Sequence, residues 1–100
     1  MNTKIEEMDG KTVVVLEGEM DTAAAQEAEG ILQQFYKNDG KDIIIECEKL
    51  EYIASSGLRI LIQMFKSAKA NGSQLILRHV NDDIMTVFKM TGFINSFTFE

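Results

Sequence analysis

The alternation of apolar and polar positions predicts two strands at the start of the chain. Residues 3–8 alternate in short polar and apolar steps and end at Asp9-Gly10, a strong hairpin turn signal. Residues 12–17 follow as a second strand. Its β-branched run Val13-Val14-Val15 is typical of a strand that is covered on both faces. We therefore expect the chain to begin with a hairpin.

The spacing of apolar positions then changes to that of a helix. Residues 18–22 are expected to break the strand and open this helix, with Asp21 or Thr22 as its N-cap. Five apolar positions recur at i, i+4, i+7, i+8 and i+11, which is one face of a helix. They are Ala24, Ala28, Ile31, Leu32 and Phe35. The turn-forming residues 38–40 (Asn-Asp-Gly) are expected to end it.

Strand-like and helix-like segments continue to alternate in the rest of the chain. They are a strand at 43–47, a helix at 58–68 that ends at 71–72, a strand at 74–78, a helix after the N-cap Asn81 that ends at 91–92, and a short edge strand at 97–99. The strand at 43–47 is apolar enough to be central in a sheet. Met64, Met85 and Met90 fall within the helical patterns and are expected to fill the core.

The resulting order, β-β-α-β-α-β-α-β, predicts an α/β fold with a mixed, largely parallel sheet and right-handed crossovers. Residues 1–100 contain no linker-like stretch and are expected to form a single domain. Residues 18–22 and 54–57 both connect a strand to a helix. In such sheets these connections share one edge, which is where binding surfaces form. We therefore expect the two connections to lie side by side.

Charge and composition narrow the classes of function. Sixteen acidic and ten basic residues give a formal net charge of −6, and the basic residues do not cluster, so direct nucleic-acid binding is not expected. No apolar run is long enough for a membrane span, and residues 1–4 lead into no signal peptide, so a cytoplasmic location is expected. The one cysteine, Cys47, is expected to be a small core residue in a reducing compartment.

The most informative residues are two serines between the second predicted helix and the strand before it. Ser55 and Ser56 lie at or just before the helix start, where backbone N–H groups lack partners. One interpretation is that a serine only caps the helix. The other is that Ser56 accepts a phosphoryl group, which the helix dipole would favour and which would stand near Asp21 and Glu19. Arg59 would then neutralise the phosphate, contact a partner, or simply be solvated.

Catalysis and metal binding are not expected. A nucleophilic serine needs a base within hydrogen-bond reach, whereas the one histidine, His79, stands at the end of a later strand and is expected to be solvated. One cysteine and one histidine cannot form a structural zinc site. The alternating acids Glu17, Glu19 and Asp21 are expected to form a solvated strand end. Because no phosphate-binding loop or dinucleotide fingerprint occurs, no cofactor is expected.

Three segments resemble those of STAS domains, the anti-sigma factor antagonists. Residues 16–21 (LEGEMD) are similar to the family's L-x-G-E-L-D segment. Residues 50–58 (LEYIASSGL) are similar to L-x-x-I-D-S-S-G-L, and residues 90–93 (MTGF) resemble the late M/L-T/S-G-L/F turn. The order of elements also agrees from about residue 3 to about residue 99.

The resemblance implies that the chain binds an anti-sigma factor that is also a serine kinase, and thereby frees a sigma factor. In the family the serine before the glycine, here Ser56, is phosphorylated, which releases the antagonist until a phosphatase restores it. The implied partner-binding residues are Asp21, Thr22, Ser55, Ser56, Gly57 and Arg59. Two positions depart from the family: Ala54 replaces a frequent aspartate, and Glu46 replaces a common asparagine.

Two alternative functions remain open at this point. The first keeps the fold and drops the switch, giving an adaptor subunit of a membrane transport complex or a larger signalling assembly. In that case the helix after Gly57 would be a fixed docking face. The second is a small serine hydrolase, which only Ser56 suggests, since residues 54–57 lack the Gly-x-Ser-x-Gly elbow.

Overall fold

The computed structural model describes residues 1–32 and 41–100. The elements are β1 (Asn2–Met8), β2 (Lys11–Met20), α1 (Thr22–Leu32), β3 (Ile43–Ile53), α2 (Ser55–Ala70), β4 (Leu75–Arg78), α3 (Asp82–Thr91), the 3-10 helix η2 (Phe93–Asn95) and β5 (Thr98–Phe99). The predicted order of strands and helices is confirmed, with η2 as an addition. The helix position Phe35 and the helix end at 38–40 lie outside the described residues. No described helix combines the length and apolarity that a bilayer crossing needs.

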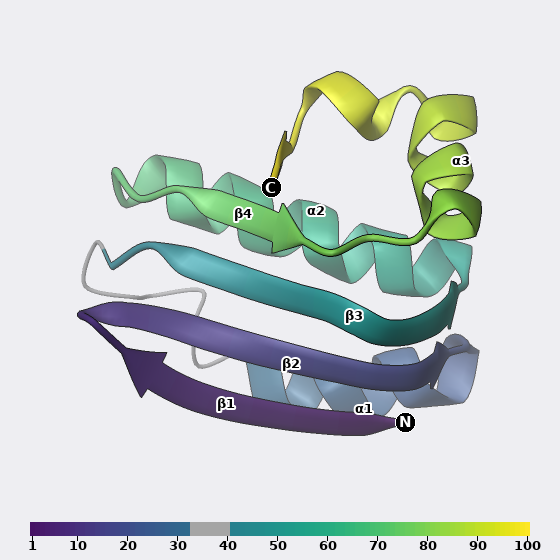
Figure 1. Cartoon of the computed structure of the whole chain (residues 1–100), viewed down its shortest axis with the longest axis horizontal. Helices are drawn as coiled ribbons and strands as arrows, with labels where there is room; N and C mark the ends of the chain where they lie inside the picture. The colour runs from purple at the N-terminus through teal and green to yellow at the C-terminus, as the bar shows by residue number, and fades with distance from the viewer. Residues whose placement is uncertain (33–40) are drawn as a thin grey trace.

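The strands form one sheet in the order β1-β2-β3-β4-β5. β1 and β2 pair antiparallel across a turn in which Asp9 and Gly10 both have positive φ, as tight hairpins require. All other neighbouring strands pair parallel. Figure 1 shows α1 and α2 on the same face of the sheet, behind the strands in that view. The prediction of a mixed, largely parallel α/β sheet is therefore confirmed.

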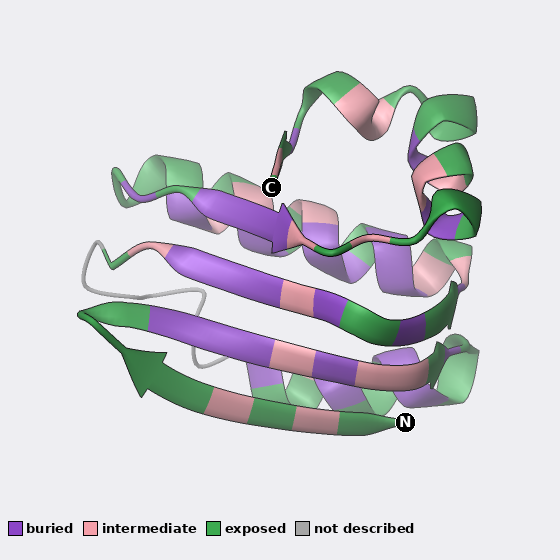
Figure 2. Cartoon of the chain, in the orientation of Figure 1, coloured by how far each residue is buried: buried purple, intermediate pink, exposed green. Residues whose placement is uncertain are grey.

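The main hydrophobic core lies between the sheet and the helices α1 and α2. Alternate strand residues such as Val14, Leu16 and Ile45 are fully buried there. Val13 belongs to a separate small cluster with Ile44 and Ile76. Residues 13–15 were predicted to be covered on both faces; Val13 and Val14, on opposite faces, are both buried, and Val15 is half-buried. No described helix lies over the second face (Figures 1 and 2). Strand neighbours rather than helices shield that face.

β2 and β3 are longer than the predicted strands and end together. β2 continues through Gly18 to Met20, so the predicted break of the strand at Gly18 is wrong. Gly18 has a φ of 99°, which glycine adopts without steric cost, and the register between β2 and β3 shifts directly after it. The glycine therefore forms a bulge inside the strand. Beyond it, Met20 pairs with Ile53 at the ends of both strands.

The C-terminal part of the chain runs from α3 to β5, which is the last strand at the β4 edge of the sheet. α3 begins as predicted, with the Oδ1 atom of Asn81 accepting a 2.8 Å hydrogen bond from the backbone N–H of Ile84. It ends at Gly92, which has the left-handed conformation typical of a helix end. The rings of Phe88 and Phe97 meet edge to face with centroids 5.3 Å apart. The predicted short edge strand is confirmed as β5, beside β4.

The methionines differ in how well they fit the prediction that they fill the core. Met64 is buried as expected, and Met85 is half-buried. Met90 is 81% exposed, so its assignment to the core is wrong. It lies in the last turn of α3, on the side that no described element covers, which helical spacing alone did not reveal.

Helix α2 approaches the ends of β2 and β3 so closely that it needs a glycine. A Cβ atom on Gly57 would lie 2.9 Å from Cγ of Met20 and 3.0 Å from Cγ1 of Ile53. Both of those side chains are buried. Because these distances are shorter than van der Waals contact, a larger residue would have to displace α2 or distort the core.

Gly57→Ala is expected to lower the free energy of unfolding by about 1–3 kcal/mol, although alanine is the better helix former. The matched control is Gly30→Ala in α1, where a Cβ atom would meet open space. That change is expected to raise the free energy of unfolding by about 0.5–1 kcal/mol. Urea unfolding followed by circular dichroism measures both, and equal effects would contradict the close-approach argument.

The thiol of Cys47 is buried in the core beneath α1 and α2, as predicted. Burial raises the pKa of the Cys47 thiol to about 12, and the charge of Glu46 adds to this effect. In the unfolded chain the thiol ionises near its ordinary pKa of 9.0. Between these two values the unfolded state binds fewer protons than the native state, so stability falls as the pH rises.

Ionisation of the Cys47 thiol in the unfolded chain is expected to lower the free energy of unfolding. The loss is up to about 1.4 kcal/mol for each pH unit above the pKa of the unfolded chain. Urea unfolding of the wild type and of Cys47→Ala at about pH 8 and about pH 10 isolates this contribution. The stability advantage of the wild type is expected to shrink at the higher pH. An advantage that is the same at both pH values would show that the thiol ionises as easily in the native state.

Candidate functional site

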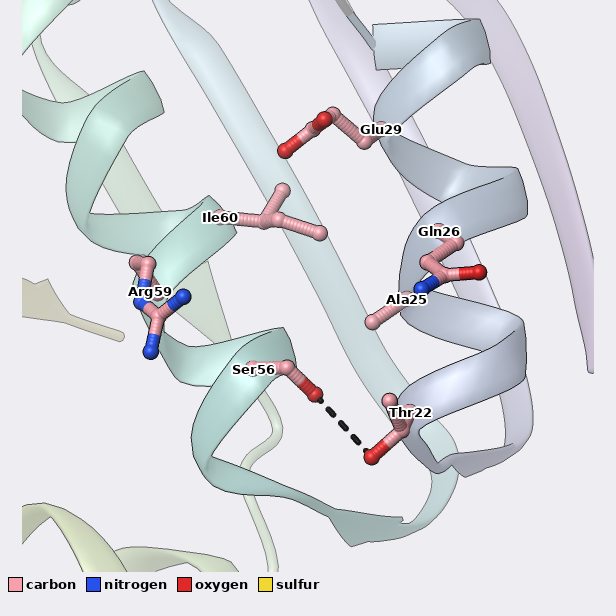
Figure 3. A pocket seen from close by; sticks show the side chains of 7 residues that line it. All are labelled: Thr22, Ala25, Gln26, Glu29, Ser56, Arg59 and Ile60. Atoms are coloured by element: carbon pink, nitrogen blue, oxygen red, sulfur yellow. Dashed lines mark hydrogen bonds between the residues drawn. The ribbon is translucent and has the colours of Figure 1, made fainter.

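The β2–α1 and β3–α2 connections lie next to each other at one edge of the sheet, as predicted. The backbone N–H of Ala54 donates a 2.8 Å hydrogen bond to the backbone carbonyl of Met20, which joins the end of β3 to the end of β2. α1 and α2 therefore begin at the same edge. Figure 3 shows the first turns of the two helices facing each other.

Asp21 is the N-cap of α1. Its Oδ1 atom accepts a 2.8 Å hydrogen bond from the backbone N–H of Ala24, so of the two predicted caps the aspartate fills this role. The carboxylate is thus engaged with its own helix. Glu17, earlier in the same acidic alternation, pairs instead with lysines on β1 and β3. Thr22, the exposed first residue of α1, keeps its hydroxyl available to α2.

α2 begins without a side-chain cap. Its N-cap is Ala54, and no side chain hydrogen-bonds to the first turn at that position. Ser55 and Ser56 are the first two residues of the helix itself, so the interpretation of a serine as the cap is wrong. Ser55 is exposed and Ser56 is half-buried. Capping of α2 therefore does not account for either serine.

The hydroxyl of Ser56 is directed toward α1. It donates a hydrogen bond to Oγ1 of Thr22 at 3.4 Å, as Figure 3 shows. The usual O–H···O distance is about 2.7–2.8 Å, so this bond orients the hydroxyl only weakly and is broken at little cost. The oxygen lies at the border of a surface hollow and is not sealed in the core.

This hollow, the α1–α2 hollow, has a volume of about 230 Å³. Its lining residues are Thr22, Ala25, Gln26, Glu29, Ser56, Arg59 and Ile60. Ala25 and Ile60 are buried and form an apolar floor. Gln26 and Glu29 are absent from the predicted site, although Thr22, Gln26 and Glu29 recur at i, i+4 and i+7, the spacing of one helix face. That periodicity of polar residues was the available signal.

Gly57 and Arg59 serve the site in different ways. Gly57 is buried against the sheet, so its contribution is its small size. Arg59 is exposed and borders the α1–α2 hollow. It forms no ion pair with another residue of the described ranges. In Figure 3 its side chain leans toward the end of α2 that contains Ser56.

His79 contacts acidic residues of β3 and not the Ser56 hydroxyl. Its Nδ1 atom lies 2.7 Å from Oε1 of Glu46, while Nε of Arg78 lies 3.3 Å from the other oxygen of that carboxylate. Glu48 brings a third potential metal ligand within 4.8 Å of the other two. Because Arg78 already neutralises Glu46, we interpret this group as an ion-pair network across β3 and β4. The histidine is not positioned to activate Ser56.

Comparison with known proteins identifies the family. The family model of the STAS domain matches residues 2–100. BtrV of Bordetella bronchiseptica is 25% identical over 97 residues, which are 97% of this chain and 84% of BtrV. The anti-sigma-B factor antagonist of Staphylococcus aureus is 30% identical over 75 residues, which are 75% of this chain and 69% of that protein.

Solved structures of SpoIIAA, an anti-sigma factor antagonist of Bacillus, share the fold. The unphosphorylated form matches with a TM-score of 0.74 and 21% identity, over 89% of this chain and 83% of SpoIIAA. The phosphorylated form matches with a TM-score of 0.76 and 20% identity, over 99% and 91%. Since the family model spans almost the whole chain and the fold agrees with it, this chain belongs to the STAS domain family.

Proposed function

We propose that this protein is a cytoplasmic anti-sigma factor antagonist without catalytic activity of its own. It binds an anti-sigma factor that is also a serine kinase, frees the sigma factor, and loses this binding when Ser56 is phosphorylated; a phosphatase reverses the modification. The main support is the position of the Ser56 hydroxyl, which borders an open hollow and, among the described residues, hydrogen-bonds weakly to Thr22 alone. The name of the Staphylococcus aureus relative agrees with this function.

The proposed partner-binding residues surround the starts of α1 and α2. They are Asp21, Thr22, Ser55, Ser56, Gly57 and Arg59. All except Ser56 and Gly57 are exposed, and Ser56 is half-buried at the border of the hollow. Gly57 is buried and acts by letting α2 lie close to the sheet. A partner that docks here would cover both helix starts at once.

Phosphorylation at this position changes the surface and leaves the fold in place. The bond between the γ-phosphorus of ATP and the oxygen that bridges it to the β-phosphorus breaks, and ADP leaves with that oxygen. The Ser56 Oγ–P bond forms, and the hydroxyl proton is released to solvent. The hydrogen bond of that hydroxyl to Thr22, at 3.4 Å, is too long to contribute much to stability. The phosphoryl group adds about −1.5 to −2 charges, which the N-terminal end of α2 favours. A partner surface that fits a neutral hydroxyl then meets a bulky dianion.

ATP and the anti-sigma factor kinase of the source organism are expected to add one phosphoryl group to the wild type and to Ser55→Ala, and none to Ser56→Ala. Mass spectrometry of the intact chain and of its peptides measures this directly.

Ser56→Asp is expected to weaken kinase binding by at least about tenfold, which is 1.4 kcal/mol, because it places a negative charge at the interface. Far-UV circular dichroism of Ser56→Asp is expected to match the wild type. Phosphate only on another residue, with normal binding by Ser56→Asp, would refute the proposal.

Ala54 favours a second candidate function, a non-switching adaptor subunit of a transport or signalling complex. Where STAS domains often have aspartate, this chain has an alanine at the N-cap position, whose side chain cannot hydrogen-bond to the first turn of α2 and adds no charge beside Ser56. An adaptor would hold its partner through α2 whether or not ATP is present. Pull-downs with the tagged chain, with and without ATP, separate the two functions. Release of the partner on addition of ATP indicates the switch, whereas ATP-insensitive co-purification with a transporter ATPase indicates the adaptor.

A further inference from the structure

Among the described residues that line the α1–α2 hollow, Arg59 is the only cationic one. It follows Ser56 by three positions on α2, which is about one helical turn. Long side chains on a helix lean toward its N-terminus, over the residues at i−3 and i−4, and Figure 3 shows this direction for Arg59. Because no ion pair with a described residue holds the guanidinium elsewhere, it is free to bind an anion at Ser56.

Thr22 offers a second hydrogen-bond donor to a phosphoryl group on Ser56. In the unmodified chain the Ser56 and Thr22 hydroxyl oxygens lie 3.4 Å apart, and either hydroxyl can donate to the other. The ester oxygen of a phosphoserine has no proton to donate. The Thr22 hydroxyl can rotate and donate its own proton to a phosphate oxygen, since a hydroxyl is both donor and acceptor. Thr22 would therefore be the donor in the hydrogen bond between α1 and the modified residue.

We propose that a phosphoryl group on Ser56 is bound by this chain itself, with the Arg59 guanidinium and the Thr22 hydroxyl as its donors. This inference rests on the proposed phosphorylation of Ser56. The planar guanidinium matches two phosphate oxygens at once, which a lysine ammonium does not. The modified site is then a fixed and partly neutralised surface. Partner binding is lost for two reasons, the added charge and the withdrawal of Arg59 from the partner.

Two carboxylates near the site oppose this arrangement without displacing it. Asp21 is already hydrogen-bonded to the first turn of α1. Glu29 lines the α1–α2 hollow, but Figure 3 places it at the opposite end from Ser56 and Thr22. Arg59 comes from the same helix turn as the phosphate and supplies an attractive charge beside it.

The test uses the full chain with phosphoserine inserted at position 56 during translation, so that no kinase is needed. Titration followed by ³¹P NMR measures the second pKa of the phosphate. Arg59 is expected to hold that pKa below the ordinary value of about 6, and Arg59→Gln to raise it by about half a unit or more. Arg59→Lys, which keeps the charge but lacks the planar fork, is expected to restore part of the shift.

The matched control is Lys66→Gln, which removes the same charge from an exposed position farther along α2. Ten residues of helix separate it from Ser56 by about 15 Å, beyond the Debye length of about 10 Å at 0.1 M salt, so little change is expected. Equal pKa changes in Arg59→Gln and Lys66→Gln would overturn the proposal. A phosphate pKa in the native chain equal to that in the urea-unfolded chain would overturn it as well.

Kinase binding to the same samples separates this inference from the proposed function. If the phosphoserine chain binds the kinase as tightly as the unmodified chain while Arg59→Gln raises the pKa, the proposed function fails and the phosphate contact stands. If phosphoserine abolishes binding while Arg59→Gln leaves the pKa unchanged, the phosphate contact is refuted and the switch stands.

Discussion

The close approach of α2 to the paired ends of β2 and β3 is the constraint on which the site depends. At Gly57, which faces Met20 and Ile53, there is room only for a hydrogen atom. This limit fixes how near α2 lies to the sheet. On a helix, the neighbouring residue then has a determined direction. With Gly57 facing the sheet, Ser56 faces α1 and its hydroxyl meets Thr22. The position of the hydroxyl is thus a consequence of core packing.

This arrangement separates the chemistry of the site from the stability of the fold. The core beneath α1 and α2 consists of buried apolar residues, whereas the Ser56 hydroxyl bonds to Thr22 at the border of the α1–α2 hollow. Both caps that use side chains, Asp21 and Asn81, are independent of Ser56 as well. A charge at Ser56 therefore acts on the surface of the α1–α2 hollow and on whatever docks there. We therefore expect the domain to remain folded in both states.

Local sequence patterns predicted the features that depend on neighbouring residues. The order of elements, the cap at Asn81 and the burial of Cys47 all follow from propensity and periodicity within short windows, and all are confirmed. Gly18 was misread because a glycine with positive φ occurs both at strand ends and in bulges, and only strand pairing distinguishes them. Met90 shows the same limit, since helical spacing does not say whether another element covers a face.

The candidate site was likewise predictable only as far as local sequence patterns define it. Resemblance to the family and the strand-to-helix connections indicated Ser56 and its neighbourhood. The α1–α2 hollow was not predicted, because Gln26 and Glu29 become part of the site only when two helices distant in sequence lie side by side. Likewise, the serines were good cap candidates by residue type, yet the strand pairing carries β3 to Ile53 and places the helix start at Ser55.

The central claim is that phosphate at Ser56 changes a surface and not the fold. Amide hydrogen exchange and ¹H–¹⁵N NMR spectra of the unmodified and Ser56-phosphorylated chain test it most directly. The account predicts chemical-shift changes confined to the starts of α1 and α2 and the α1–α2 hollow, with unchanged slow exchange at core positions such as Val14, Ile45 and Leu77. Faster exchange of those core amides in the phosphorylated chain would contradict it.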